Sequence, residues 1–211
     1  MSDTVWISIA MGHGEANLLR LRHSFSETDQ RKDAIAWGNQ NVAGEPLKAE
    51  CFPAEIYGAP DARESDYRLP NLFFAGSFWA VSKAAADVLR QFDLDAGALY
   101  PVKVFKKDRQ TPLGDEWFCI NFGNRKEAVA VPESSTLLRE SYIRPGGVKG
   151  WVPKATLKDG DIAVSKAVCE GPDIWIDPQI GDASFLSDAL GMALKKAKAD
   201  KGFLLHKCRV L

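Results

Sequence analysis

Apolar residues fall into short runs along this chain, and two stretches carry them at helical spacing. Runs rich in β-branched and aromatic residues are typical of buried strands, whereas apolar residues three and four positions apart form one face of a helix. Strands are predicted at residues 5–10, 48–57, 98–106, 116–122, 162–168, 173–178 and 203–210. Helices are predicted at residues 83–91 and after Ser184 or Ser187. This mixture predicts an α+β fold with a mixed or antiparallel sheet.

One part of this pattern occurs twice, at residues 78–105 and at residues 183–210. Each copy has a serine before the helical stretch, and a serine hydroxyl there can accept an unpaired N–H of the first turn. We therefore predict that Ser82 and Ser187 are helix N-caps. We expect two similar helix–strand units packed into one core, within a single globular domain of residues 1–211. Aligned without a gap, the copies match at Ser82 and Ser187, Leu89 and Leu194, and Gly97 and Gly202.

The segments between these units are polar and rich in turn residues. Irregular structure is expected over residues 15–45 and 58–70, and residues 132–160 are predicted to be loop-rich. The polar residues 107–114 are expected to turn a hairpin between two strands. The apolar strand at 203–210 should lie inside a sheet, because an exposed apolar edge would invite pairing with other chains.

Composition is that of a folded protein and argues against several functional classes. Hydrophobic residues make up 45% and charged residues 26%, which is ordinary for a globular protein. The net charge of -1 argues against general nucleic-acid binding. No apolar run approaches the roughly 18 residues needed to span a bilayer, and the start lacks a basic signal segment. A cytoplasmic protein with no membrane or nucleic-acid partner is expected, either a monomer or a homodimer.

Cysteine and histidine usage gives no sign of a metal or cofactor. The cysteines are far apart and lack CxxC spacing, which favours buried free thiols over metal ligands or disulfides. With three histidines in the chain, a zinc site is not expected. We therefore predict neither a metal nor a cofactor. The four cysteines are Cys51, Cys119, Cys169 and Cys208.

Charge is distributed unevenly along the sequence. Residues 27–66 contain nine acidic residues against four basic ones, whereas residues 189–211 are basic. One interpretation is two solvated faces; the other is an acidic surface that steers a basic protein partner.

Few residues resemble catalytic machinery. Gly12-His13-Gly14 places a titratable imidazole on a flexible backbone, and Asp173 and Asp177 could form a carboxylate pair on one strand face. A turn with an exposed histidine, and carboxylates that end a strand, are the favoured interpretations. Gly123 is expected to take a positive φ in a turn after a strand.

Six tryptophans are many for this length. Trp6, Trp79, Trp117 and Trp175 lie in apolar runs, which favours core positions over a sugar- or base-binding platform. Trp37 and Trp151 lie among polar or glycine-rich residues, so they are the candidates for interface anchors.

Several segments resemble a bacterial immunity-protein family, the eleventh among the immunity proteins of polymorphic toxin systems, formerly a domain of unknown function. The similarity covers roughly residues 70–210, so the chain divides into a variable N-terminal part, about 1–70, and a family-like part, about 71–211. None of these segments is a catalytic signature. The segments are residues 72–82, 89–92, 97–102, 117–124, 171–178 and 185–187.

The resemblance implies a cytoplasmic, non-enzymatic protein that binds and occludes a cognate protein toxin. The divergent, acidic N-terminal part is then where partner specificity is expected. The alternatives are a small-ligand or carbohydrate-binding module, and a hydrolase that uses His13. The candidate toxin-binding residues, chosen by charge and predicted exposure, are Glu27, Asp29, Asp33, Trp37, Glu45, Asp61, Glu64 and Asp66.

Overall fold

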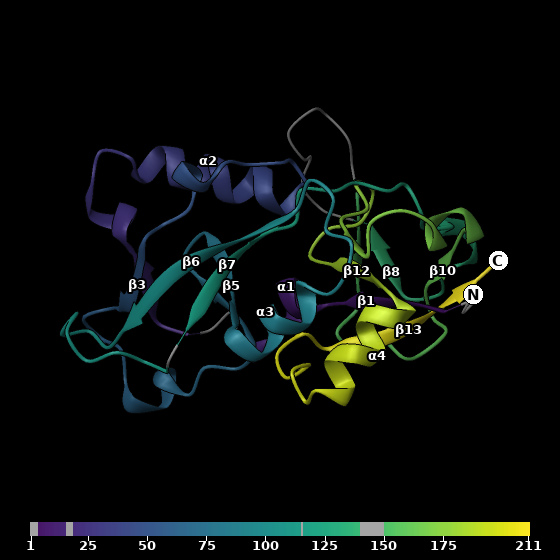
Figure 1. Ribbon diagram of the computed structural model, residues 1–211. Helices are drawn as coiled ribbons and strands as arrows, with labels where there is room; N and C mark the ends of the chain where they lie inside the picture. The colour runs from purple at the N-terminus through teal and green to yellow at the C-terminus, as the bar shows by residue number, and fades with distance from the viewer. Residues whose placement is uncertain (1–3, 16–18, 115, 140–149) are drawn as a thin grey trace.

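Two mixed sheets dominate the computed structural model, which describes residues 4–15, 19–114, 116–139 and 150–211 (Figure 1). The larger sheet has six strands in the order β2-β3-β6-β7-β5-β4. In it β3 and β6 are parallel, and the other neighbours are antiparallel. Its strands are β2 (Leu21–His23), β3 (Glu55–Gly58), β4 (Leu72–Ala75), β5 (Phe78–Ser82), β6 (Ala98–Phe105) and β7 (Trp117–Asn121).

The second sheet has five strands in the order β10-β13-β1-β12-β11. Here β10 and β13 are parallel and the other neighbours antiparallel. The last strand, β13, therefore lies inside a sheet, as predicted. The strands are β1 (Thr4–Ser8), β10 (Ala163–Val164), β11 (Ile174–Trp175), β12 (Ser184–Ser187) and β13 (Leu205–Val210); a separate pair consists of β8 (Leu137–Arg139) and β9 (Trp151–Pro153).

Helices complete an α+β fold, which confirms the predicted class. The α-helices are α1 (Ala10–His13), α2 (Arg31–Val42), α3 (Lys83–Leu89) and α4 (Asp188–Lys196). Short 3-10 helices are η2 (Ser24–Glu27), η3 (Ala49–Cys51), η4 (Glu64–Tyr67), η5 (Val131–Glu133) and η6 (Lys166–Cys169).

The two sheets share one topology. With β2 set aside, the orders β3-β6-β7-β5-β4 and β10-β13-β1-β12-β11 correspond strand by strand, with the same parallel and antiparallel pairings. In the first sheet β5, α3 and β6 follow one another and β7 lies between the two strands. In the second, β12, α4 and β13 enclose β1 in the same way. The sequence echo is therefore a structural repeat, whose second copy is completed by the N-terminal strand.

Alternating side chains of β5 belong to two different hydrophobic clusters, as the two faces of a pleated strand require. Phe78 and Ala80 pack in a cluster with Ala34 of α2, whereas Trp79 and Val81 pack in a central cluster with α3. The central cluster also contains residues of the second sheet and α4, so the two units share one core. These residues include Trp6, Ile174, Leu186, Leu190 and Leu194.

Both predicted N-caps are present. The hydroxyl of Ser82 accepts the backbone N–H of Ala85 at 3.2 Å, and that of Ser187 accepts the N–H of Leu190 at 3.2 Å. Each cap contributes about 1 kcal/mol to helix stability. Of the two serines proposed for the second helix, Ser187 is therefore the cap.

Equivalent cation–π contacts cover the two central strands. The guanidinium of Arg90 lies 4.2 Å from the ring centroid of Phe118 on β7, and the ammonium of Lys195 lies 4.3 Å from that of Trp6 on β1. The gapless alignment of the two copies places Arg90 on Lys195. The repeat therefore extends from topology to individual side-chain contacts.

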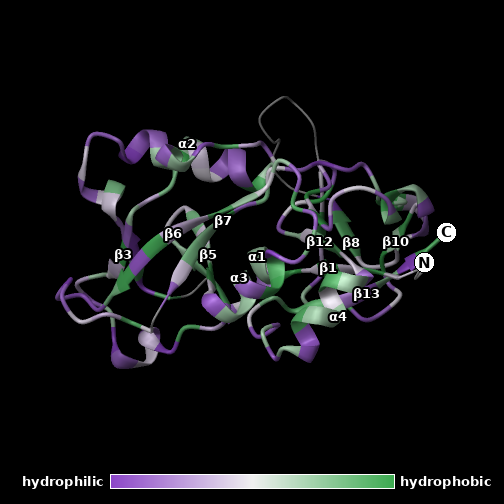
Figure 2. Ribbon diagram, viewed as in Figure 1, coloured by the Kyte–Doolittle hydropathy of each residue, from purple (hydrophilic) through white to green (hydrophobic). Residues whose placement is uncertain are grey.

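Helix α2 occupies a segment for which irregular structure is expected, so that prediction is wrong. Its buried positions are Ala34, Gly38 and Asn41, too small or polar to produce an apolar periodicity. Figure 2 shows the resulting mostly hydrophilic ribbon. The Asn41 amide donates to the Ile120 carbonyl and accepts the Phe122 N–H, both at 2.9 Å, so contacts with β7 hold the helix in place.

Other expectations are met in part. Residues 48–57 were expected to be one strand, but η3 occupies the beginning and β3 the end. The hairpin between β6 and β7 is confirmed. The loop-rich stretch at 132–160 contains η5, β8 and β9, and its residues 140–149 lie outside the described residues.

Most of the tryptophans and cysteines assigned to the core are there. Trp6, Trp79 and Trp175 are buried, and Trp117 is half-buried against a core cluster. All four cysteines are free; Cys119 and Cys208 are buried, whereas the other two are half-buried.

Candidate partner-binding site

A pocket of about 250 Å³ opens where the two edges of the six-stranded sheet, β2 and β4, approach each other and three segments meet. Strand β2 and η2 supply one wall, α2 a second, and the turn between β4 and β5 a third. The pocket is lined by Leu21, Arg22, His23, Ser26, Arg31, Ile35, Gly76 and Ser77.

Local structure explains how these side chains reach the pocket. Alternation along β2 buries Leu21 and His23 and leaves Arg22 exposed between them. The backbone N–H of His23 donates to the hydroxyl of Ser26 at 3.1 Å, which holds η2 against the strand. Gly76 has a φ of +71°, and a Cβ there would lie 3.1 Å from the His23 ring, so glycine permits both the turn and the close approach.

His23 is 4% exposed and contacts aromatic rings on the core side, with its centroid 5.0 Å from that of Phe78. Burial, and secondarily the positive charge of Arg31, lower the pKa of His23 from 6.5 to about 4. Its Nδ1 has no hydrogen-bond partner among the described residues. At neutral pH the ring is therefore uncharged, and the positive charge of the pocket comes from its arginines.

The lowered pKa predicts a specific loss of stability in acid. Between pH 6.5 and about 4 the unfolded chain binds a proton at His23 that the folded chain does not, so the free energy of unfolding falls as pH falls through this window. We expect His23→Gln to flatten this part of the curve, measured by chemical denaturation at pH 7, 6, 5 and 4. Curves of wild type and variant that stay parallel across the window would contradict the assignment.

The residues considered for catalysis have structural partners. Nε2 of the exposed His13 donates to the carbonyl of Pro153 at 2.8 Å. Asp177 is fully buried and accepts three backbone N–H groups, and Asp173 accepts the N–H of Asp93 at 2.9 Å. No ion pair or hydrogen bond joins His13 to either aspartate within the described part of the chain.

The described ranges contain neither a candidate metal site nor a helix that could span a membrane. No group of three or more histidine, cysteine or acidic side chains could hold a metal ion among residues 4–15, 19–114, 116–139 and 150–211. In the same ranges, no helix combines the length and apolar character needed to cross a bilayer.

The geometry of the pocket does not identify a family, but comparison with known families does. The model of an immunity protein family, Imm11, matches residues 49–209. The chain belongs to this family. No curated protein matches the chain. The Imm11 match confirms the resemblance read from the sequence and starts earlier, at residue 49 rather than at about 70.

The Imm11 match leaves out β1, β2 and α2, which have different roles. Strand β1 is the central strand of the five-stranded sheet, so it is part of the scaffold. Strand β2 and α2 lie at the edge and on the face of the other sheet, and they supply most of the pocket. The pocket therefore lies where the segment preceding the Imm11 match meets the matched scaffold.

Most acidic candidates are neutralised by basic neighbours rather than gathered into one site. The acidic candidates lie on three segments, at residues 27–33, at Glu45 and at residues 61–66. Asp29 and Asp33 are exposed and have no ion-pair partner among the described residues. The ion pairs are Glu27 with Arg22 at 3.5 Å, Glu45 with Arg125 at 2.9 Å, Asp61 with Arg20 at 2.8 Å, Glu64 with Lys106 at 2.9 Å, and Asp66 with Arg63 at 3.6 Å.

Two of the candidates are less exposed than expected. Asp66 is 4% exposed and accepts the backbone N–H of Arg63 at 2.8 Å, so the expectation of exposure is wrong for it. Trp37 is half-buried, with its ring 5.4 Å from that of Phe25. Both side chains stabilise local structure, whatever else they contact.

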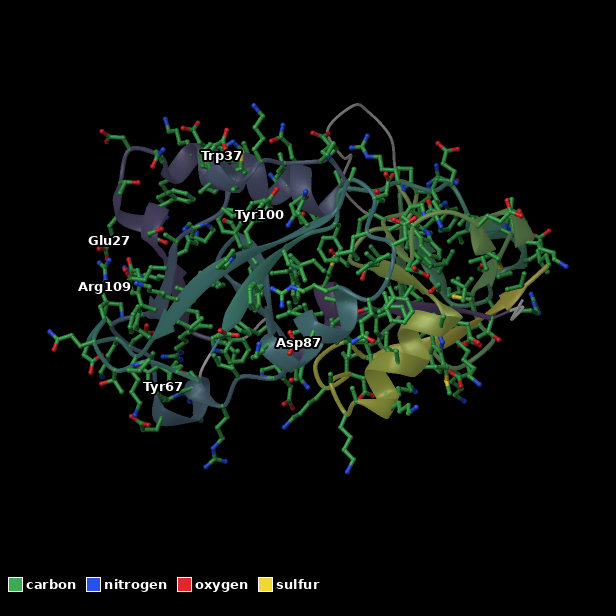
Figure 3. All side chains as sticks on the ribbon, in the orientation of Figure 1. Glu27, Trp37, Tyr67, Asp87, Tyr100 and Arg109 are labelled. Atoms are coloured by element: carbon green, nitrogen blue, oxygen red, sulfur yellow. The ribbon has the colours of Figure 1, made fainter. Side chains whose placement is uncertain are left out.

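Glu27 also belongs to a charge cluster beside the pocket. Arg109 forms a two-pronged ion pair with Glu55, at 2.8 and 3.2 Å, and lies over the ring of Tyr57. Figure 3 shows Glu27 and Arg109 at the same end of the six-stranded sheet. Arg22 and Arg109 therefore offset the charges of Glu27 and Glu55, and these two carboxylates do not form an acidic surface.

The pocket residues themselves were not identified from the sequence. Arg22, Ser26, Arg31, Ile35 and Ser77 carry no motif and come from segments up to about fifty residues apart. Their association depends on how α2 packs against the turn between β4 and β5. The only local signal is the basic character of Arg31 within an acidic stretch.

Proposed function

We propose that this chain neutralises a cognate bacterial protein toxin by binding it directly, without catalysing a reaction. The match of residues 49–209 to an immunity protein family carries the proposal. The structural use of His13, Asp173 and Asp177 supports a mechanism by steric occlusion. We place this interaction in the cytoplasm of the toxin-producing cell or its kin.

Co-expression with each toxin candidate encoded beside this gene tests the proposal. We expect the chain to restore growth against one candidate and to form a stable complex with that protein in a pull-down. His13→Ala, a change at an exposed residue, should protect as well as the wild type, because no proton transfer is required.

Two results would count against the proposal. Failure to rescue cells from any neighbouring candidate contradicts the immunity function. Rescue that a folded His13→Ala variant loses, while it still binds the toxin, contradicts occlusion and favours a reaction that uses this imidazole.

A further inference from the structure

The pocket between β2 and the turn that joins β4 to β5 is lined by basic side chains although part of it lies in the most acidic part of the sequence. Among the described residues, its lining contains two arginines and no carboxylate. Arg31 has no ion-pair partner among the described residues, and Arg22 is held by Glu27 at 3.5 Å only. Both guanidinium groups therefore keep hydrogen-bonding capacity for a further acceptor.

The remaining lining fits an anionic side chain. The hydroxyls of Ser26 and Ser77 can each donate a hydrogen bond, and His23 closes the inner end of the pocket as a buried ring. Ile35 lies at the pocket with half of its side chain exposed, 50%, and offers apolar contact to the stem of an entering residue. A cationic side chain would meet both arginines, and the carboxylate nearest to them, Glu27, is already paired with Arg22 at 3.5 Å.

We propose that this pocket receives an aspartate or glutamate side chain of the toxin, held between Arg22 and Arg31. This proposal rests on the proposed function. Arginine and carboxylate match in geometry and form charge-assisted hydrogen bonds. The volume of about 250 Å³ accommodates one side chain rather than a helix or a loop. The partner's contact surface is then acidic at this point, opposite in sign to the basic partner that the acidic stretch predicts.

The helix supplies a matched pair of variants. Arg31 and Lys32 are neighbours in the first turn of α2 and both are exposed, but only Arg31 lines the pocket. Arg31→Glu and Lys32→Glu change the net charge equally, so any difference between them reports the pocket and not the general field. The affinity of each variant for the cognate toxin is measured by calorimetry, with thermal unfolding as the check that both are folded.

We expect Arg31→Glu to weaken binding by about 100-fold and Lys32→Glu by about threefold or less. Arg22→Gln should also weaken binding, by about tenfold, and serves as the second variant if Arg31→Glu does not fold. A toxin variant in which the contacting carboxylate is replaced by lysine should recover affinity with Arg31→Glu.

Each other outcome has a definite meaning. If the two variants on α2 weaken binding equally, or if neither weakens it, the pocket assignment is overturned while the immunity function stands. If inorganic phosphate binds at Arg31 and the toxin affinity is unaffected by Arg31→Glu, the occupant is a small anion and the proposal is overturned. If the unsubstituted chain fails to bind any candidate toxin, the proposed function is overturned. The proposal that the pocket binds a toxin carboxylate is then overturned as well.

Discussion

Replacing Asp177 by alanine should destabilise the fold by about 3–5 kcal/mol. The side chain is fully buried, and its Oδ2 accepts the backbone N–H groups of Ala128 and Val129, while its Oδ1 accepts that of Gln179, all at 2.8 Å. Alanine would leave these three donors without a partner inside the protein, and each buried unpaired donor costs about 1–3 kcal/mol. Urea denaturation at pH 7 measures the change.

Asp108→Ala is the matched control for this experiment. Asp108 also accepts two backbone N–H groups, from Gln110 at 3.0 Å and Thr111 at 2.9 Å, but it lies in the exposed turn between β6 and β7. Water can replace the lost acceptor there, so the loss should be much smaller than for Asp177→Ala. Equal losses for the two variants would show that burial of the donors does not set the cost.

The second large effect is expected at Gly123, where alanine should destabilise the protein by about 3 kcal/mol or more. Gly123 has a φ of +63°, as predicted from its position after a strand. A Cβ there would overlap the carbonyl group of Ala96 and lie 2.7 Å from the backbone nitrogen of Gly97. Because these obstacles are backbone atoms, a rotamer change cannot relieve them.

Gly160→Ala separates the two causes of that loss. Gly160 has a φ of +86°, but a Cβ there would meet nothing within 4 Å, so only the backbone strain of about 1 kcal/mol applies. Thermal and urea unfolding of both variants should therefore give a clearly larger loss at position 123. Similar losses would mean that the close approach of Ala96 is relieved by movement of the loop.

The features that could be predicted from the sequence are those with a local cause. Ser82 and Ser187 were identifiable as caps because an N-cap hydrogen bond spans three residues. The hairpin between β6 and β7, and the positive φ of Gly123, likewise depend on residues close in sequence. The family resemblance rests on the same strand and turn segments.

The pocket and α2 could not be predicted for the complementary reason. Helix α2 buries Ala34, Gly38 and Asn41, residues with little apolar surface, and is held by hydrogen bonds to β7 about eighty residues away. The acidic excess of residues 27–66 indicated a negative surface, but five of its carboxylates pair with arginines or lysines from other segments. The net charge of a sequence segment therefore does not predict the charge of the surface on which that segment lies in the folded protein.

The sequence by itself determined the two helix–strand units, the α+β class and the family, because caps, apolar spacing and turn residues act between near neighbours. The tertiary structure decided that β7 lies between β5 and β6, and β1 between β12 and β13, which makes the two sheets equivalent. It also decided that Arg22 and Arg31 line a common pocket together with Gly76 and Ser77. These arrangements depend on contacts between residues far apart in the chain, and no local pattern encodes which distant partners meet.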